Sequence, residues 1–159
     1  MKTLIAYSSK YGCTEKCARG LSEKLSGETD LLNLKAGKPA DLSRYDRVIV
    51  GGSVYMGKIQ KRVSDFCIKN MDQLKSKKLG LFICCMAEGK DAEDELKRVF
   101  PQELLQAAAV ADYFGGEFIF KKMNPAYRMI IKKVAKTDRD VSNIRGENIN
   151  RFAHLMNDA

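Results

Sequence analysis

Three predominantly apolar stretches that do not alternate with polar residues constrain the fold of this chain more than any other feature. They occupy residues 4–7, 47–53 and 79–86, and each has the length of a single strand. After the first stretch, Cys17, Leu21 and Leu25 recur at every fourth position, which is helical spacing. Strands that are apolar on both faces and alternate with helices form a parallel sheet covered by helices on both sides. We therefore expect an α/β fold.

The rest of the pattern predicts the order of the elements. Strands are expected at residues 4–7, 29–34, 47–53, 79–86 and 109–120, the last with a bulge at Gly115 and Gly116. Helices are expected at residues 14–25, 60–71, 91–99, 102–107, 124–136 and 142–156. In such sheets, ligands bind beyond the carboxyl ends of the strands, where the strand order reverses. The loops at residues 8–14, 51–58 and 86–90 each follow a strand, so we expect them to meet at one edge.

Length and composition indicate one globular domain that spans residues 1–159. A hydrophobic content of 45% with 30% charged residues argues against disorder. No apolar run approaches the roughly 20 residues that a membrane-spanning helix needs. The first residues lack the apolar core of a signal peptide, so we expect a cytoplasmic protein.

The five cysteines do not have the spacing of a metal or redox motif. Their number is odd, and their spacing fits neither a zinc knuckle nor a C-x-x-C pair. With a single histidine, His154, no metal site is expected. Cys67, Cys84 and Cys85 lie in apolar runs, which is typical of small core residues. Cys13 differs, because a thiol near the start of a helix can have a lowered pKa and is a candidate reactive group.

The net charge of +8 favours an acidic partner, a carboxylate-bearing substrate or an anionic membrane surface. The sequence has no recognition-helix motif, aromatic RNA-binding signature or zinc finger. We therefore expect no nucleic acid among the partners.

The loop after the first strand has the composition of an anion-binding site. It combines the hydroxyls of Ser8, Ser9 and Thr14 with Gly12, where the backbone can approach a ligand closely. The start of a helix offers unpaired N–H groups and the positive end of the helix dipole, which together favour a phosphate. An ordinary turn in which Thr14 or Ser9 caps the helix is the alternative. The candidate binding residues are Ser8, Ser9, Lys10, Tyr11, Gly12, Cys13 and Thr14.

The spacing in this loop excludes two common phosphate-binding motifs and resembles a third. Neither G-x-x-x-x-G-K-[ST] nor G-x-G-x-x-G follows the strand. An apolar strand followed by Ser/Thr-x-x-Gly-x-Thr, matched here by Ser9, Gly12 and Thr14, resembles the phosphate loop of the flavodoxin family. The resemblance implies that this loop holds the 5′-phosphate of FMN.

Two further loops share the resemblance. The sequence G-G-S-V-Y-M-G-K at residues 51–58 is similar to the flavodoxin loop that lies against the isoalloxazine ring. Tyr55 and Met56 would give that ring a flat and a polarisable neighbour. The sequence C-C-M-A-E-G-K-D at residues 84–91 would offer backbone donors to the pyrimidine end of the ring. These loops add the candidate FMN-binding residues Ser53, Val54, Tyr55, Met56, Gly57, Met86, Ala87 and Gly89.

The resemblance covers nearly the whole chain and implies a flavodoxin-like fold. That fold is a three-layer, doubly wound, five-stranded parallel sheet of order 2-1-3-4-5, followed here by a basic helical segment. It implies an FMN-binding oxidoreductase or electron-transfer protein whose partner is a redox protein or a quinone. Because the flavin would carry the chemistry, no catalytic side chain is expected. A non-enzymatic binding domain of the same fold is the alternative from another class.

A narrower resemblance points to the menaquinone-dependent protoporphyrinogen oxidases. It depends on S-V-Y-M-G-K after the third strand, F-P-Q-E-L-L before the last strand, and the basic segment that follows. It implies a porphyrin substrate and a quinone acceptor. The oxidases carry Arg-Tyr where this chain has Tyr55-Met56, so any role of that arginine does not transfer.

The basic segment is the second candidate functional region. An apolar stripe at Tyr127, Ile130, Ile131 and Val134 is expected to lie opposite its cationic face. Such a helix could lie on the inner face of an anionic membrane or bind a porphyrin carboxylate, while an ordinary surface helix packed on the sheet is the alternative. Its candidate contact residues are Lys121, Lys122, Arg128, Lys132, Lys133 and Lys136.

Overall fold

The computed structural model describes residues 1–135 and 140–158. The α-helices and β-strands follow in the order β1 (Lys2–Ser8), α1 (Cys13–Ser22), β2 (Glu28–Asn33), β3 (Arg47–Tyr55), β4 (Lys58–Ile59), α2 (Lys61–Lys69), α3 (Met71–Ser76), β5 (Lys78–Cys84), α4 (Gly89–Val99), α5 (Gln102–Ala107), β6 (Val110–Tyr113), β7 (Gly115–Phe118), α6 (Pro125–Ala135), β8 (Val141–Ile144) and α7 (Gly146–Asp158). Short 3-10 turns lie at Leu34–Ala36, Leu42–Arg44 and Phe120–Lys122.

The main sheet confirms the predicted α/β architecture. Its path runs β2-β1-β3-β5-β6, and these neighbours pair in parallel. This is the predicted order 2-1-3-4-5, counted without the short β4, which pairs antiparallel with the end of β3. The order reverses beside β1, so the carboxyl ends of β1 and β3 flank the crossover where such sheets bind ligands.

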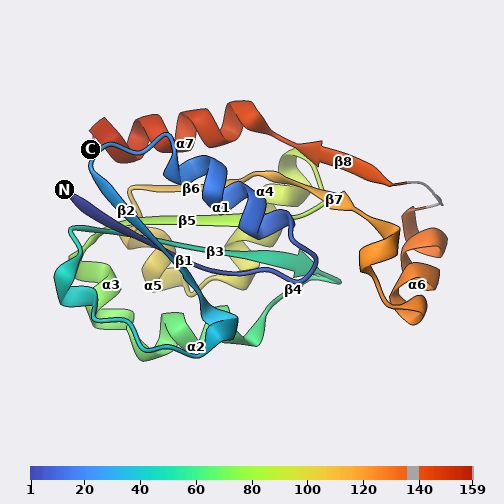
Figure 1. Cartoon of the computed structure of the whole chain (residues 1–159), viewed down its shortest axis with the longest axis horizontal. Coiled ribbons are helices and arrows are strands. Elements are labelled where there is room, and N and C mark those ends of the chain that lie inside the picture. Colours follow the sequence, from blue (N-terminus) through green and yellow to red (C-terminus); the bar gives the residue numbers. More distant parts are fainter. Residues whose placement is uncertain (136–139, 159) are drawn as a thin grey trace.

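Helices cover both faces of the sheet, as Figure 1 shows. On one face, α1 and α7 pack on alternate strand residues such as Ile5, Ile49 and Phe82. On the other face, α2, α3, α4 and α5 pack on residues of the opposite parity, including Val48 and Leu81. Because both side-chain parities are buried, the strands read as continuous apolar runs rather than alternating ones.

The region after β6 differs from the prediction of one bulged strand at residues 109–120. The chain leaves the parallel sheet at Gly115, and β7 pairs antiparallel with β8 in a separate two-stranded sheet. Gly115 has φ +79, and a Cβ there would lie 1.9 Å from the Asn143 carbonyl oxygen. The predicted helix at 142–156 was therefore wrong at its start, because Ser142 and Asn143 belong to β8.

The helix expected at 60–71 is also divided. The structure has α2 up to Lys69, a break at Asn70, and then α3, which extends to Ser76. The Asn70 side chain donates a hydrogen bond to the Phe66 carbonyl oxygen at 2.9 Å, competing for the carbonyl at the end of α2.

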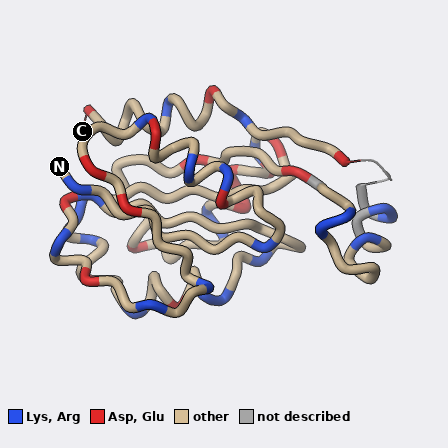
Figure 2. Tube along the Cα trace, in the orientation of Figure 1, with Lys and Arg blue, Asp and Glu red and all other residues tan. Residues whose placement is uncertain are grey.

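The loops that follow β1, β3 and β5 gather at one end of the molecule, opposite the two termini (Figure 1). The segment that contains α6 extends beyond the sheet at that same end. Lys and Arg residues occur over much of the tube in Figure 2, including the α6 segment. Within the described residues, no helix is long and apolar enough to cross a bilayer.

Candidate functional site

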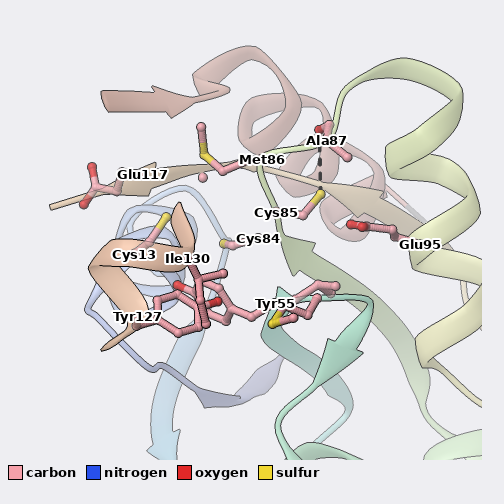
Figure 3. A pocket seen from close by; sticks show the side chains of 13 residues that line it. Cys13, Tyr55, Cys84, Cys85, Met86, Ala87, Glu95, Glu117, Tyr127 and Ile130 are labelled. Atoms are coloured by element: carbon pink, nitrogen blue, oxygen red, sulfur yellow. Dashed lines mark hydrogen bonds between the residues drawn. The ribbon is translucent and has the colours of Figure 1, made fainter. Parts of the chain in front are cut away.

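A cavity of about 240 Å³ opens where the three loops meet (Figure 3). Its walls come from the start of α1, the ends of β3 and β5, and parts of β7, α4 and α6. The lining residues are Cys13, Val54, Tyr55, Met56, Cys84, Cys85, Met86, Ala87, Glu95, Gly116, Glu117, Tyr127 and Ile130. A mostly apolar, aromatic and sulfur-containing lining with a few polar groups is typical of small-molecule sites.

A second, open hollow lies beside the first loop. It is lined by Ser8, Ser9, Lys10, Lys35, Gln60, Lys61, Arg62 and Asp65. Four cations against one carboxylate make this hollow suited to an anion.

The predicted site residues fall in and around these two hollows. Cys13, Val54, Tyr55, Met56, Met86 and Ala87 line the cavity, and Ser8, Ser9 and Lys10 line the open hollow. The others lie next to them: Tyr11 packs on Tyr55, Gly12 precedes α1, Thr14 contacts Ser53, Gly57 forms the β3-β4 turn, and Gly89 begins α4.

Helix α1 begins without a side-chain cap. Gly12 occupies the N-cap with φ +99, so neither Thr14 nor Ser9 caps the helix in the described structure. The Ser9 hydroxyl instead accepts a hydrogen bond from the Gly12 N–H at 3.0 Å, which shapes the loop. A Cβ on Gly12 would lie 3.5 Å from the Lys122 ammonium. The first turn of α1 therefore presents backbone donors next to a lysine.

Three tyrosines form a cluster over the edge of the sheet. The ring centroids of Tyr11, Tyr55 and Tyr127 lie 5.5–5.7 Å apart. The Lys10 ammonium lies 4.4 Å from the centroid of Tyr127, within cation–π range. Burial raises the pKa of Tyr127 to about 12, so its hydroxyl is protonated at neutral pH.

The β3-β4 connection is a two-residue turn formed by Met56 and Gly57. Both residues have positive φ, 53° and 76°, as in the type I′ turns that suit β-hairpins. Met56 is the only non-glycine residue with positive φ in the described chain, and its side chain is 75% exposed at the cavity. The turn therefore presents an apolar sulfur-containing side chain to solvent beside the site.

The third loop lies close to β7. Gly116 has no side chain, and a Cβ there would approach the Met86 sulfur at 2.9 Å and the Cys85 backbone at 3.0 Å. The Cys85 thiol donates a weak hydrogen bond to the Ala87 carbonyl oxygen at 3.7 Å. Close to Cys85, one carboxylate oxygen of Glu95 is buried and has no hydrogen-bond partner among the described residues (Figure 3).

Glu117 brings a buried carboxylate to the cavity wall. It accepts hydrogen bonds from Lys16 and Ser142, each at 2.9 Å. Burial by itself would raise the pKa of Glu117, but these two hydrogen bonds and the positive charges of Lys16 and Lys122 together outweigh it, and the pKa is lowered. The ion pair with Lys16 joins α1 to the β7-β8 sheet.

Three thiols lie together under the start of α1. The side chains of Cys13, Cys17 and Cys84 are buried, and their sulfur atoms all lie within 4.8 Å of one another. Hydrogen bonds from Cys17 and Cys84 lower the pKa of Cys13 to about 4, while the pKa values of the other two thiols are raised. Of the three thiols, Cys13 is therefore the one whose surroundings favour the thiolate form.

The basic segment partly covers the cavity. Its residues Tyr127 and Ile130 line the cavity, and Tyr127 is buried against Tyr11 and Tyr55. The Lys122 ammonium lies close to Gly12 of the first loop. Arg128 donates a hydrogen bond to the Met123 carbonyl oxygen at 3.0 Å. Lys121, Lys132 and Lys133 are exposed. Lys136 and the side chains of Ile131 and Val134 lie outside what the structure describes.

Sequence reasoning missed several cavity residues. Cys84, Cys85, Glu95, Gly116 and Glu117 line the cavity but were not predicted as binding residues. Cys84 and Cys85 could have been found from their position at the end of an expected strand. Glu95 and Glu117 come from α4 and β7, and no local motif marks them.

Comparison with known structures gives distant matches. A reduced Megasphaera elsdenii flavodoxin matches with a TM-score of 0.62 at 14% identity, with 99% of each chain covered. A Fusobacterium nucleatum flavodoxin mutant bound to flavin mononucleotide matches with a TM-score of 0.50 at 10% identity, with 98% of this chain and 94% of that chain covered. Rubredoxin:oxygen oxidoreductase of Desulfovibrio gigas matches at 0.52 and 19% identity over 99% of this chain, which spans only 37% of that protein. At these low identities, the structural matches show a shared fold.

Sequence comparison identifies the family. No curated protein sequence matches the chain. The family model described as a flavodoxin domain, however, matches residues 4–144, most of its length. The chain therefore belongs to the flavodoxin domain family.

Proposed function

We propose that this protein binds FMN without a covalent bond and transfers electrons through it. The observation that carries the proposal is the uncapped start of α1, which lies at the same edge of the sheet as the cavity lined by Tyr55 and Met56. The start of α1 suits a phosphate, and the cavity suits a flat ring. Their position at one edge of the sheet is the arrangement that FMN binding of the flavodoxin type would require. The Fusobacterium neighbour described as bound to flavin mononucleotide supports the same cofactor.

The residues of the first loop fit a phosphate group. Gly12 leaves the approach to the α1 N–H groups open, since it carries no Cβ. The Lys122 ammonium and the cations of the open hollow would offset a double negative charge. The Tyr11 hydroxyl, buried without a hydrogen-bond partner in the described structure, would gain one from the ligand.

The cavity fits the isoalloxazine ring. Tyr55 and Tyr127 would exclude water from its surroundings, and Met56 and Met86 would contact it through polarisable sulfur atoms. FMN, when bound, supplies the electron- and hydride-transfer chemistry. The chain binds and orients it and controls its access to solvent.

A titration with two ligands tests this proposal. Protein freed of flavin is titrated with FMN and with riboflavin, which lacks the phosphate, and the quenching of flavin fluorescence is followed. We expect FMN to bind at least tenfold more tightly than riboflavin, because only FMN can use the first loop. A protein that quenches neither ligand would instead be a binding domain of the same fold without flavin.

A second candidate function is the oxidation of a porphyrinogen with a quinone as electron acceptor. It is favoured by two exposed methionines, Met56 at the cavity (75% exposed) and Met129 on α6 (72% exposed), and by the cations of the α6 segment. Apolar side chains next to lysines suit the surface of an anionic membrane, where a quinone resides, and lysines suit the carboxylates of a porphyrin.

Two measurements test the second candidate. When the FMN-loaded protein is given a porphyrinogen and a menaquinone analogue, porphyrin fluorescence should increase. The absence of turnover with any quinone would rule this role out. Sedimentation with anionic vesicles should weaken in the variant Lys132→Glu/Lys133→Glu. The matched variant Lys69→Glu/Lys97→Glu, which changes exposed residues of α2 and α4 by the same charge, should sediment like the unmodified protein.

A further inference from the structure

We propose that Cys13, Cys17 and Cys84 form a binding site for a thiophilic divalent metal ion of the zinc type. This site borders the cavity proposed for the isoalloxazine ring, since Cys13 and Cys84 line that cavity, and the proposal therefore concerns the flavin-free protein. It uses thiol side chains, whereas the FMN phosphate would use the backbone of the same loop.

The fold brings the three thiols together from two elements. Cys13 and Cys17 are one helical turn apart on the buried face of α1. Cys84 is the last residue of β5, where it pairs in register with Ser53 of β3. The hydrogen bond between the Thr14 and Ser53 hydroxyls holds the start of α1 over this corner of the sheet.

The sulfur positions suit a tetrahedral metal site. Zinc binds cysteine sulfur at about 2.3 Å, which places two sulfurs of a tetrahedron about 3.8 Å apart. The three sulfur atoms here all lie within 4.8 Å of one another, so small side-chain rotations would complete the geometry. Within the described residues this is the only group of three or more cysteine, histidine or acidic side chains with such spacing.

The cavity gives the metal a route of entry and a fourth ligand. Cys13 and Cys84 are both part of its wall, as Figure 3 shows, so an ion that enters the cavity would lie next to two of the three ligands. Three protein ligands with one open position is the arrangement of catalytic rather than structural zinc sites. Water from the cavity would occupy the fourth position.

Charge favours a divalent ion over a monovalent one. Metal binding releases the remaining thiol protons, so the three ligands bind as thiolates with three negative charges. A divalent ion reduces this charge to one and a monovalent ion only to two. The nearby Lys16 is paired with Glu117, so these two charges offset each other. The positive end of the α1 dipole is then what stabilises the single remaining charge.

The competing explanation is that the three cysteines are ordinary small core residues, and the chain offers a matched control for it. Cys67 is equally buried, on α2 in the core of the opposite sheet face, and is not part of the cluster. Cys67→Ser, like Cys84→Ser, replaces a buried thiol with a hydroxyl, but it leaves the three sulfur atoms of the cluster in place.

The test is a titration of the reduced, flavin-free, full-length protein with Cd²⁺ and with Zn²⁺. We expect one ion per chain, a thiolate-to-Cd²⁺ absorption band, and a higher melting temperature in Zn²⁺. Cys13→Ser, Cys17→Ser and Cys84→Ser should each weaken Zn²⁺ binding at least 100-fold, whereas Cys67→Ser should bind like the unmodified protein.

Two outcomes would overturn the site. The first is an unmodified protein that shows neither the absorption band nor stabilisation by Zn²⁺, a result that does not depend on whether any variant folds. The second is a loss of binding in Cys67→Ser equal to that in the cluster variants. Since the protein is flavin-free, neither result bears on the proposed binding of FMN.

Discussion

The hydroxyl of Thr14 shares a hydrogen bond with the hydroxyl of Ser53, 39 residues further along the chain. Both side chains are buried, and the bond joins the first turn of α1 to the end of β3. It therefore fixes the first loop relative to the second, the two parts that the proposed FMN site needs to hold at a constant distance.

A double-mutant cycle tests this link. Thr14→Val and Ser53→Ala should each lower the free energy of unfolding by about 1–2 kcal/mol, because each removes one partner of a buried hydrogen bond. The double variant should lose about 1 kcal/mol less than the sum of the two. Urea unfolding of the flavin-free protein measures all four values, and additive losses would show that the two hydroxyls are not coupled.

Lys122 should contribute to FMN affinity, and its neighbour Lys121 should not. Both lysines are exposed and lie on the same turn, but only the Lys122 ammonium lies next to the Gly12 position. Lys122→Gln should weaken FMN binding about fivefold, roughly 1 kcal/mol, by removing one charged contact to the phosphate. Riboflavin affinity should not change. Equal effects of Lys121→Gln and Lys122→Gln would indicate only a general effect of net charge.

Gly115→Ala should destabilise the protein strongly. The residue has φ +79, and the new Cβ would lie 1.9 Å from the Asn143 carbonyl oxygen, so β7 and β8 would have to separate. We expect a loss of about 2–4 kcal/mol in the free energy of unfolding. Gly20→Ala is the control, because Gly20 lies within α1 with open space around it, and there alanine should stabilise by about 0.5–1 kcal/mol.

Arg47 is a fully buried cation that holds the start of β3 to distant segments. Its guanidinium donates to the Thr3 hydroxyl at 2.8 Å, to the Met156 carbonyl oxygen at 3.2 Å, and to the Ser26 carbonyl oxygen. Arg47→Ala should leave these acceptors without their donor and create a void, lowering the free energy of unfolding by about 3–5 kcal/mol. Thermal unfolding measures this, and a change below 1 kcal/mol would contradict the prediction.

Glu117 should make stability depend on pH in the acid range. The pKa of Glu117 in the folded protein is lower than its ordinary value of 4.5. The carboxylate therefore stabilises the fold above pH 4.5, and this stabilisation is lost as the pH falls through the folded pKa. Glu117→Gln should remove this part of the acid dependence, so that its stability falls less between pH 5 and pH 3 than that of the unmodified protein. Parallel curves for the two proteins over this range would refute it.

The sequence by itself determined the parallel α/β sheet and its strand order. Apolar runs such as residues 79–86 and helical periodicity such as Cys17, Leu21 and Leu25 are local properties, and the burial of both strand faces leaves few ways to arrange them. The turn at Gly57 is a local property as well. The position of the three loops at one edge follows from the parallel pairing of the strands, because the carboxyl ends of parallel strands lie at the same edge.

Only the tertiary structure decided which distant side chains meet. The expected strand at residues 109–120 is interrupted at Gly115, where the backbone lies close to the carbonyl oxygen of Asn143, 28 positions later. The thiol cluster forms because Cys84 of β5 lies against the buried face of α1. Tyr127 lines the cavity because its ring packs on Tyr11 and Tyr55, which come from the loop after β1 and the end of β3. Such contacts are set by how helices and strands pack across the chain, and no local pattern encodes them.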